Sequence, residues 1–403
     1  MRLDLRFGAL LSASILAAGH VHAQEPKLPA TVDADTTFSW DASYTADIIS
    51  PVDGMEGDAR GVFLDDVSLS GALNLERLMG WRGASLTGYV LSNSGGEPNA
   101  RLGTLEGVSN IEVERARVRL FELYLTQGFG GGFGDVRVGL IDLNARFYAT
   151  PSSDLLIAPP FGIGSELAAT GPAGPSIFPS SALAVEARVA PVEGVYAQVG
   201  VFNARAGTVG DPDGVDTEFE DGALLIGELG LTGEEGLLAF GAWAYTEDQD
   251  DLRDVRADGS PEPRTSRGAY ALVERPLNDL EGPRATTAFF RFGLSEGETT
   301  PFRGSAQAGF STQRVFAGRP DSQFALGVHY ARLSDDFVDN AAAAGDDLES
   351  SEYGLELTYS DALTPWLTVQ PNLQAIANPG GRADADTLIV AGLRIGIAFS
   401  GER

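Results

Sequence analysis

The chain has no cysteine and very little histidine, and both absences narrow the chemistry open to it. Without cysteine it falls outside the class of small secreted domains that disulfides hold together. Two of the three histidines, His20 and His22, lie close to the N-terminus, which leaves His329 alone in the rest of the chain. One histidine is a poor supply for a zinc site or a histidine-based catalyst. We therefore expect no enzyme and no bound metal or other cofactor.

Positive charge is scarce as well. The chain has 28 lysines and arginines against 57 aspartates and glutamates, a formal net charge of −29. Residues 1–23 hold two arginines and one aspartate, so the chain without them carries −29 − 1 = −30. Such acidity excludes nucleic acid as a partner and disfavours docking onto anionic lipid surfaces. Lys27 is the only lysine, so nearly every fixed cation is an arginine, which suits forked hydrogen bonds and ion pairs.

Long hydrophobic runs are also missing, apart from one short stretch at the start. Residues 7–18 are mostly apolar, follow Arg2 and Arg6, and precede Val21-His22-Ala23, which ends in a small residue as a cleavage site does. This stretch is too short to span a bilayer as a helix, and no later run approaches the ~18–20 residues that a spanning helix needs. We predict a secretory signal peptide at residues 1–23, a polar leader at 24–36 and a single domain at 37–403.

What the chain has in abundance is alternation of apolar and polar residues. In residues 385–399 one set of positions is apolar, and the set between them holds Gly392, Arg394 and Gly396. Successive side chains of a strand point to opposite faces, so this run predicts a strand with two different environments. The same pattern occurs in residues 363–381 and in fourteen earlier runs, at residues 38–48, 65–75, 85–91, 117–127, 135–142, 182–189, 195–202, 223–231, 237–246, 268–275, 288–295, 303–311, 324–333 and 353–359.

These sixteen runs predict an all-β fold, a transmembrane antiparallel β-barrel of about sixteen strands. An even number of alternating strands separated by Gly, Asp and Pro turns favours hairpins that close into a barrel. Each run is roughly 7–12 residues long, about what a tilted strand needs to cross a bilayer, and lipid tolerates only helices or closed barrels. Short connections alternate with long ones, which is typical of outer-membrane barrels with short periplasmic turns and long extracellular loops. A soluble β-protein would expose apolar residues on most of its strands. We therefore place the chain in the outer membrane of a Gram-negative bacterium.

The last two strands carry two further signals. Pro371 removes a hydrogen-bond donor from the first of them, which predicts a bulge there. The second ends on Phe399, an aromatic residue close to the chain terminus, and the four residues Ser-Gly-Glu-Arg follow it. We expect the outer-membrane assembly machinery to recognise the chain through this C-terminal strand, with Phe399 as the signal.

Several segments, taken in order, resemble the OprB-type carbohydrate-selective porins of Gram-negative outer membranes. The resemblance covers most of the chain beyond the signal peptide, although the middle loops diverge from the family's pattern. Its landmarks are residues 73–81, 107–112, 119–127, 318–336, 355–374 and 378–381. The resemblance implies a sixteen-stranded barrel that passes monosaccharides, chiefly glucose, by facilitated diffusion. Its partners would then be small-molecule sugars and the lipid bilayer.

The alternation also assigns side chains to the two faces of the wall. In residues 119–127 the apolar set is Phe121, Leu123 and Leu125, which we expect to face lipid. An arginine on the lipid face near the bilayer midplane costs ~2–4 kcal/mol, so charged side chains belong inside. The inward candidates for the substrate pathway are Glu122, Tyr124, Arg137, Glu186, Arg188, Glu228, Trp243, Tyr245, Arg291, Glu356 and Arg394.

Two interpretations stay open for these residues. The charged side chains either contact the sugar or pair with one another and hold the wall rigid. Trp243 either offers an aromatic platform to a sugar ring or belongs to the aromatic girdle at the membrane interface, because a register slip of one residue reverses its face. Tyr89 is a weaker lumen candidate of the same kind.

The long loops leave three more questions open. Residues 150–180, rich in proline and glycine and containing Phe161 and Phe178, either fold inward and narrow the pore or form a surface loop. Acidic residues of the long loops are either solvated or bridge lipopolysaccharide phosphates through divalent cations. The alternative function is a general-diffusion porin for small hydrophilic solutes with little sugar preference. Inward charges of both signs argue against an anion-selective ring of arginine and lysine.

Overall fold

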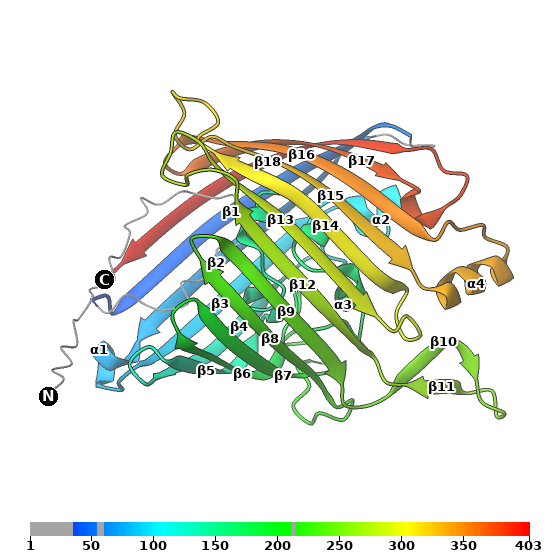
Figure 1. The fold of residues 1–403 in the computed structure, drawn as a ribbon, viewed down its shortest axis with the longest axis horizontal. Coiled ribbons are helices and arrows are strands. Elements are labelled where there is room, and N and C mark those ends of the chain that lie inside the picture. The colour runs from blue at the N-terminus through cyan, green and yellow to red at the C-terminus, as the bar shows by residue number, and fades with distance from the viewer. Residues whose placement is uncertain (1–34, 55–59, 212–213) are drawn as a thin grey trace, which may run out of the picture.

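The computed structural model describes residues 35–54, 60–211 and 214–403, and the predicted signal peptide and most of the leader lie outside these residues. Sixteen antiparallel strands form a closed barrel, in which β1 pairs with β18 (Figure 1). The barrel strands are β1 (Phe38–Asp53), β2 (Val62–Asn74), β3 (Ala84–Gly95), β4 (Arg117–Phe129), β5 (Gly134–Ile141), β6 (Ala182–Val192), β7 (Val195–Asn203), β8 (Ala223–Gly233), β9 (Gly236–Tyr245), β12 (Arg267–Pro276), β13 (Ala285–Ser295), β14 (Phe302–Gln313), β15 (Gln323–Leu333), β16 (Ser351–Thr364), β17 (Leu367–Ala377) and β18 (Leu388–Glu402). Each of the sixteen predicted runs coincides with one of them, so the predicted fold class is confirmed.

The alternation divides the wall into an apolar outside and a polar inside. Outward side chains such as Leu229, Phe240 and Val199 are 65%, 59% and 58% exposed. A soluble protein would not leave such side chains uncovered over its whole girth, whereas a hydrocarbon surround solvates them. Inward positions of the same strands hold buried polar residues, Glu228 and Gln198 among them.

The connections contain short helices and one extra hairpin. The helices are α1 (Leu75–Met79), α2 (Pro98–Leu102), α3 (Ser165–Ala168) and α4 (Asp335–Ala344), with 3-10 turns η1 (Leu143–Ala145), η2 (Pro151–Ser153), η3 (Pro159–Phe161) and η4 (Pro379–Gly381). None of the helices in the described part of the chain has the length and apolar character needed to span a bilayer. Strands β10 (Gln249–Val255) and β11 (Pro261–Arg264), which the sequence did not predict, form a separate sheet beside α4 at one end of the barrel (Figure 1).

A β-bulge in β4 reverses one predicted side chain. Glu122 pairs with Tyr89 and Leu120 pairs with Val90, so Phe121 is an extra residue without a partner across the ladder. The prediction that Phe121 faces lipid is wrong, because the inserted residue turns its side chain inward. Phe121 is 2% exposed and packs edge-on against Tyr89, with the ring centroids 5.5 Å apart.

The bulge predicted at Pro371 is absent. Pro371 pairs with Leu393 in β18, and the register is unbroken on both sides of this pair. On the other side, pairing with β16 pauses and resumes in the same register, from Thr358–Asn372 to Asp361–Val369. The missing N–H of Pro371 therefore interrupts only the pairing of β17 with β16, and β17 keeps its register without an inserted residue.

The four residues after Phe399 complete the closure of the barrel. Ser400, Gly401 and Glu402 continue β18 and pair with residues 39–41 of β1. The Arg403 backbone N–H donates to the Phe38 carbonyl at 2.8 Å, and the Arg403 carbonyl accepts N–H groups of residues 37 and 38. The side chain of Phe399 points outward and stacks on Trp366, with the ring centroids 6.5 Å apart.

Deletion of residues 400–403 is therefore expected to weaken the seam between β1 and β18. Each lost backbone hydrogen bond costs about 0.5–1.5 kcal/mol, so the barrel in detergent should unfold at a clearly lower temperature. The shift from the folded to the unfolded band on a gel after stepwise heating measures this. Ser400→Ala keeps the backbone pairing and should behave like the parent chain. An unchanged midpoint for the deletion would show that the seam does not depend on these residues.

Candidate functional site

Two of the long connections lie inside the barrel. The inner segment (residues 142–181) joins β5 to β6, and its aromatic residues Phe147, Tyr148 and Phe161 are almost completely buried. Of the two alternatives left open for this segment, the inward one is correct. The short inner loop (residues 96–116) joins β3 to β4 and lies beside it.

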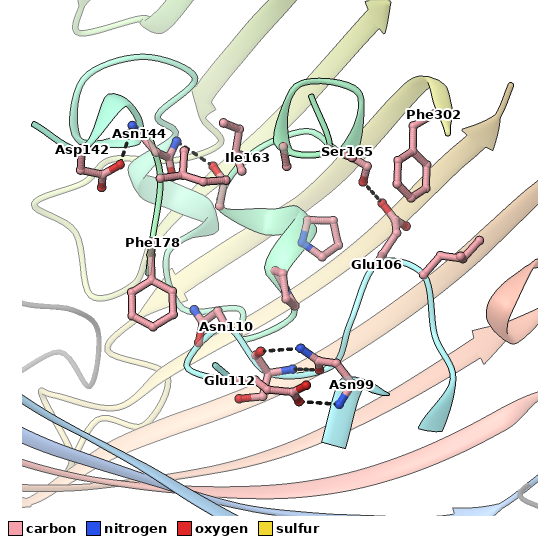
Figure 2. A pocket seen from close by; sticks show the side chains of 18 residues that line it. Asn99, Glu106, Asn110, Glu112, Asp142, Asn144, Ile163, Ser165, Phe178 and Phe302 are labelled. Carbon is pink, nitrogen blue, oxygen red and sulfur yellow. Dashed lines mark hydrogen bonds between the residues drawn. The ribbon is translucent and has the colours of Figure 1, made fainter. Parts of the chain in front are cut away.

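Between the inner segment and the short inner loop lies a cavity of about 390 Å³ (Figure 2). Its lining is partly polar and partly apolar, and it comes almost wholly from these two connections. The lining residues are Asn99, Leu105, Glu106, Ser109, Asn110, Glu112, Asp142, Asn144, Pro159, Pro160, Gly162, Ile163, Ser165, Ala168, Ala169, Ile177, Phe178 and Phe302.

Hydrogen bonds within the short inner loop hold its lining residues in place. The Glu112 carboxylate accepts the backbone N–H of Asn99 at 2.5 Å and that of Ala100 at 3.4 Å. Asn99 in turn accepts from the N–H groups of Val108 and Ser109, at 2.7 and 3.1 Å. Burial raises the pKa of the Glu112 carboxyl, and the two backbone N–H groups oppose the rise.

The inner segment presents a second polar group to the cavity. The Asp142 carboxylate accepts the Asn144 backbone N–H at 2.9 Å. The Asn144 side chain donates to the carbonyls of Phe147 and Gly162, at 3.1 and 3.2 Å, which ties the start of the segment to its middle. Figure 2 shows Asp142 and Asn144 on one side of the cavity, above Phe178.

Glu106 joins the two connections to the wall. One carboxylate oxygen accepts the Ser165 hydroxyl at 2.5 Å, and the other lies 2.5 Å from Nδ1 of His329. Glu106 is 6% exposed and His329 is 4% exposed, so this contact is closed to bulk water. The single histidine beyond the N-terminal region thus has a structural partner.

Apolar side chains form the rest of the lining. Phe178 and Phe302 lie at opposite ends of the cavity in Figure 2. Ile163, Pro159 and Pro160 add further apolar surface between them. The cavity therefore combines flat apolar faces with amide and carboxylate groups at close quarters.

Carboxylates on the inner face of the wall hold both connections. Glu356 accepts the N–H groups of Ile157 and Ala158 at 2.7 and 2.9 Å. Glu352 accepts those of Leu105 and Glu106, both at 2.9 Å. Further wall carboxylates that accept backbone N–H groups of the inner segment are Glu122 from Asp142, Glu228 from Tyr148, and Glu274 from Ser152.

Two wall arginines also hold these connections, by donating hydrogen bonds to oxygen atoms of the inner segment and of the short inner loop. Arg291 donates to the Gly162 carbonyl at 3.0 Å and also to the carbonyl of Pro160. Arg394 makes a forked pair with Asp47, at 2.7 and 2.8 Å, and donates to the Asn110 side chain at 2.6 Å. Both guanidinium groups are almost completely buried behind the cavity lining.

All eleven candidate residues lie on the inner face of the wall, but none of them is in the lining of the cavity. Most are bonded to the inner segment or to each other. Arg137 lies 3.9 Å from Glu186 and over the Tyr124 ring, and Arg188 lies over the Tyr196 ring, 4.3 Å from its centroid. Whether any of them contacts a substrate stays a prediction.

Trp243 and Tyr245 also lie inside the barrel rather than in an outer girdle. They pack edge-on, with ring centroids 6.3 Å apart, in a buried cluster that includes Phe147 and Leu167 of the inner segment. The Tyr245 hydroxyl lies 3.1 Å from that of Thr170. The prediction that both side chains face the lumen is confirmed, and there they pack against each other and the inner segment.

Sequence reasoning missed most of the cavity lining. Asn99 and Asn144 lie in connections without periodicity, so no alternation could assign them a direction, and Asp142 is only the last residue of the predicted run 135–142. One signal was available, because the family landmark at residues 107–112 contains Ser109, Asn110 and Glu112, all of which line the cavity.

Comparison with known proteins agrees with this architecture. Residues 63–399 match the family model "Carbohydrate-selective porin, OprB family". The chain belongs to the OprB family of carbohydrate-selective porins. It is 25% identical to Porin B of Pseudomonas aeruginosa over 403 aligned positions, which cover 90% of this chain and 87% of that one.

Solved structures show the same fold. OprB of Pseudomonas putida at high pH superposes with a TM-score of 0.79 at 22% identity, over 90% of this chain and 94% of that one. The outer-membrane channel DcaP of Acinetobacter baumannii gives a TM-score of 0.54 at 10% identity, over 91% of this chain and 97% of that one. Both likenesses concern the barrel and carry no statement about substrate.

Family and fold together define the molecule's setting. It is an integral β-barrel of the Gram-negative outer membrane, a channel for small sugars and not an enzyme. Among residues 35–54, 60–211 and 214–403, no group of three or more His, Cys, Asp or Glu side chains is placed to hold a metal ion.

Replacement of Glu356 tests whether wall carboxylates keep the inner segment in place. Glu356→Gln exchanges one acceptor oxygen for an N–H₂ group, so either the Ile157 or the Ala158 backbone N–H group loses its acceptor. Leaving a buried donor unsatisfied costs about 1–3 kcal/mol, so the segment should loosen and the single-channel conductance should rise and become noisier in a planar bilayer. Glu281→Gln, in an exposed short turn, is the matched control. Equal conductance for both variants and the parent would contradict the anchoring role.

Proposed function

We propose that this porin passes monosaccharides, glucose among them, by facilitated diffusion through the cavity between the inner segment and the short inner loop. The observation that carries the proposal is the composition of the lining. A sugar presents hydroxyl groups around apolar ring faces, so it fits a site that combines hydrogen-bonding groups with aromatic surface. Asn99, Glu112, Asp142 and Asn144 supply the first, and Phe178 and Phe302 supply the second.

The alternative is a general-diffusion porin with little sugar preference. Such a channel needs a water-filled lumen and gains nothing from apolar faces in its narrow part. Here two connections fill much of the lumen and place Phe178 and Ile163 in the lining. This arrangement favours the selective channel.

The wall residues enter the proposal in a supporting role. We propose that the eleven inward candidates shape the pathway chiefly by holding the inner segment and other wall residues, as Glu228 does through Tyr148 of the segment and through Tyr196 and Tyr270 of the wall. Arg188 is half-buried, more exposed than the rest, and is the best placed of them to meet a passing solute.

Glucose added to a planar bilayer that holds the pure protein is expected to reduce the ion current in proportion to its occupancy of the cavity. Liposomes that carry the protein should also swell faster in hexoses than in amino acids of similar size. A current indifferent to every sugar tested, with equal swelling rates for all solutes, would favour general diffusion instead.

Variants locate the aromatic platform within the same experiment. Loss of one aromatic stacking contact of about 0.5–1.5 kcal/mol should weaken the glucose block about 2–10-fold in Phe178→Ala. Trp366→Ala removes an aromatic ring from the outer face and should leave the block unchanged. The rival assignment places the platform at Trp243, and it predicts that Trp243→Ala weakens the block more than Phe178→Ala does.

We further propose that the assembly machinery reads Phe399 on the C-terminal strand. The side chain is 54% exposed on the outer face, where another protein can reach it before lipid covers it. Phe399→Ala should lower the amount of folded barrel in outer membranes, as measured from membrane fractions. Phe240→Ala replaces another outward aromatic residue and should insert normally. Equal insertion of the two variants would remove Phe399 as the signal.

A further inference from the structure

One arginine on the inner face of the wall, Arg188, contacts an aromatic ring and no polar group. It lies near the end of β6, close to the short periplasmic turn at 190–194, and is half-buried. Its guanidinium lies over the Tyr196 ring, 4.3 Å from the centroid, and within the described part of the chain it has no hydrogen bond or ion pair. A ring face orients a guanidinium without using its N–H groups, so all five donors stay available.

The Tyr196 ring is itself held in place. Its hydroxyl donates to the Glu228 carboxylate at 2.7 Å, and the ring lies over Gly230 of the neighbouring strand, where a side chain would collide with it. Tyr196 is 7% exposed. The ring is therefore a fixed support, and it gives the guanidinium of Arg188 a defined plane.

An open acceptor lies beside these donors. Asp135 of β5 is the cross-strand partner of Arg188, and side chains paired in this way have their Cβ atoms about 4.5–5.5 Å apart. One Asp135 oxygen accepts from Arg146 at 2.6 Å, and the other has no partner among residues 35–54, 60–211 and 214–403. A fork of N–H donors and a carboxylate oxygen thus lie next to each other on the inner face.

Buried polar atoms around this pair indicate a hydroxylic ligand. Gln198, the partner of Arg188 on β7, has a buried Oε1 without a donor in the described residues. Both carboxylate oxygens of Glu186 and one terminal nitrogen of Arg146 are in the same position, and Glu186 lies 3.7 Å from Arg146, too far for a direct hydrogen bond. Buried polar groups in native proteins are nearly always paired with protein, with water or with a ligand.

We propose that Arg188 and Asp135 form a second sugar subsite, on the periplasmic side of the inner segment, which receives a neutral hexose after the cavity. The proposal rests on the proposed passage of monosaccharides and extends it by one binding step. The guanidinium donates to neighbouring hydroxyl groups, and Asp135 accepts from one of them. Charges of both signs lie side by side, so the subsite suits a neutral polyol better than an anion or a cation. Several weak sites in series let a solute bind and still leave.

The block of ion current by glucose in a planar bilayer tests the subsite on the full-length protein. Arg188→Leu removes the donors and keeps much of the bulk, and it should weaken glucose binding about 2–10-fold, the loss expected for one hydrogen bond. Arg188→Lys keeps the charge without the planar fork and should weaken binding nearly as much. Conductance in potassium chloride alone shows whether each variant barrel is intact. Parent-like block in Arg188→Lys would overturn the role of the fork.

A control and a double variant place the effect. Arg275→Leu removes the same charge from an exposed position that pairs with Glu235 and should leave the glucose block unchanged. In Phe178→Ala with Arg188→Leu the two fold-losses should multiply, because separate sites contribute additively to the free energy. A double variant no weaker than Phe178→Ala alone would overturn the second subsite.

The same experiments separate this proposal from the proposed function. If glucose blocks neither the parent nor any variant, the sugar assignment itself fails, and the subsite fails with it. If glucose blocks the parent and both Arg188 variants equally, while Phe178→Ala is weaker, the sugar pathway through the cavity stands and only the second subsite is overturned.

Discussion

The contact on which the rest of this structure depends is the hydrogen bond from a backbone N–H of a lumen connection to a carboxylate of the barrel wall. The backbone of a segment that folds into a barrel loses its hydrogen bonds to water, so each buried N–H group then needs an acceptor in the protein. Glu352 and Glu356 supply acceptors to two separate connections, at 2.7–3.1 Å. The sequence of the inner segment reduces the demand, because prolines such as Pro159 and Pro160 carry no N–H group at all.

This contact links the wall to the transport pathway. Strands can place a carboxylate inside only because alternation keeps the apolar side chains outside, where lipid solvates them. The carboxylates then fix the connections, and the connections, not the strands, supply nearly all of the cavity lining. The pairing of β1 with β18 also affects the cavity. Asp47 on β1 pairs with Arg394 on β18, and this arginine holds Asn110 in the cavity lining.

The strands could be predicted from the sequence because a strand with lipid on one face and the lumen on the other keeps a period of two over about ten residues. The prediction failed where one inserted residue changes the period. Phe121 is apolar and adjacent to a charged neighbour, so the pattern alone placed it outside, and only the pairing with β3 shows the bulge. The bulge predicted at Pro371 was wrong for the opposite reason. The missing N–H of Pro371 interrupts pairing with β16, but no residue is inserted and the register is kept. Most cavity residues could not be predicted, since residues such as Asn99 and Asn144 follow no period.

The wall charges have a simpler explanation than sugar recognition. Oε1 of Glu356 accepts from Ile157, Thr358 and Asn372, and Oε2 accepts from Ala158. A carboxylate can accept from four donors, whereas an amide of the same shape replaces half of that capacity with donors that would face other donors. Glutamate is therefore required here by the number of acceptors, before any solute arrives. It follows that charge on the inner wall is a poor guide to the selectivity of a barrel filled in this way.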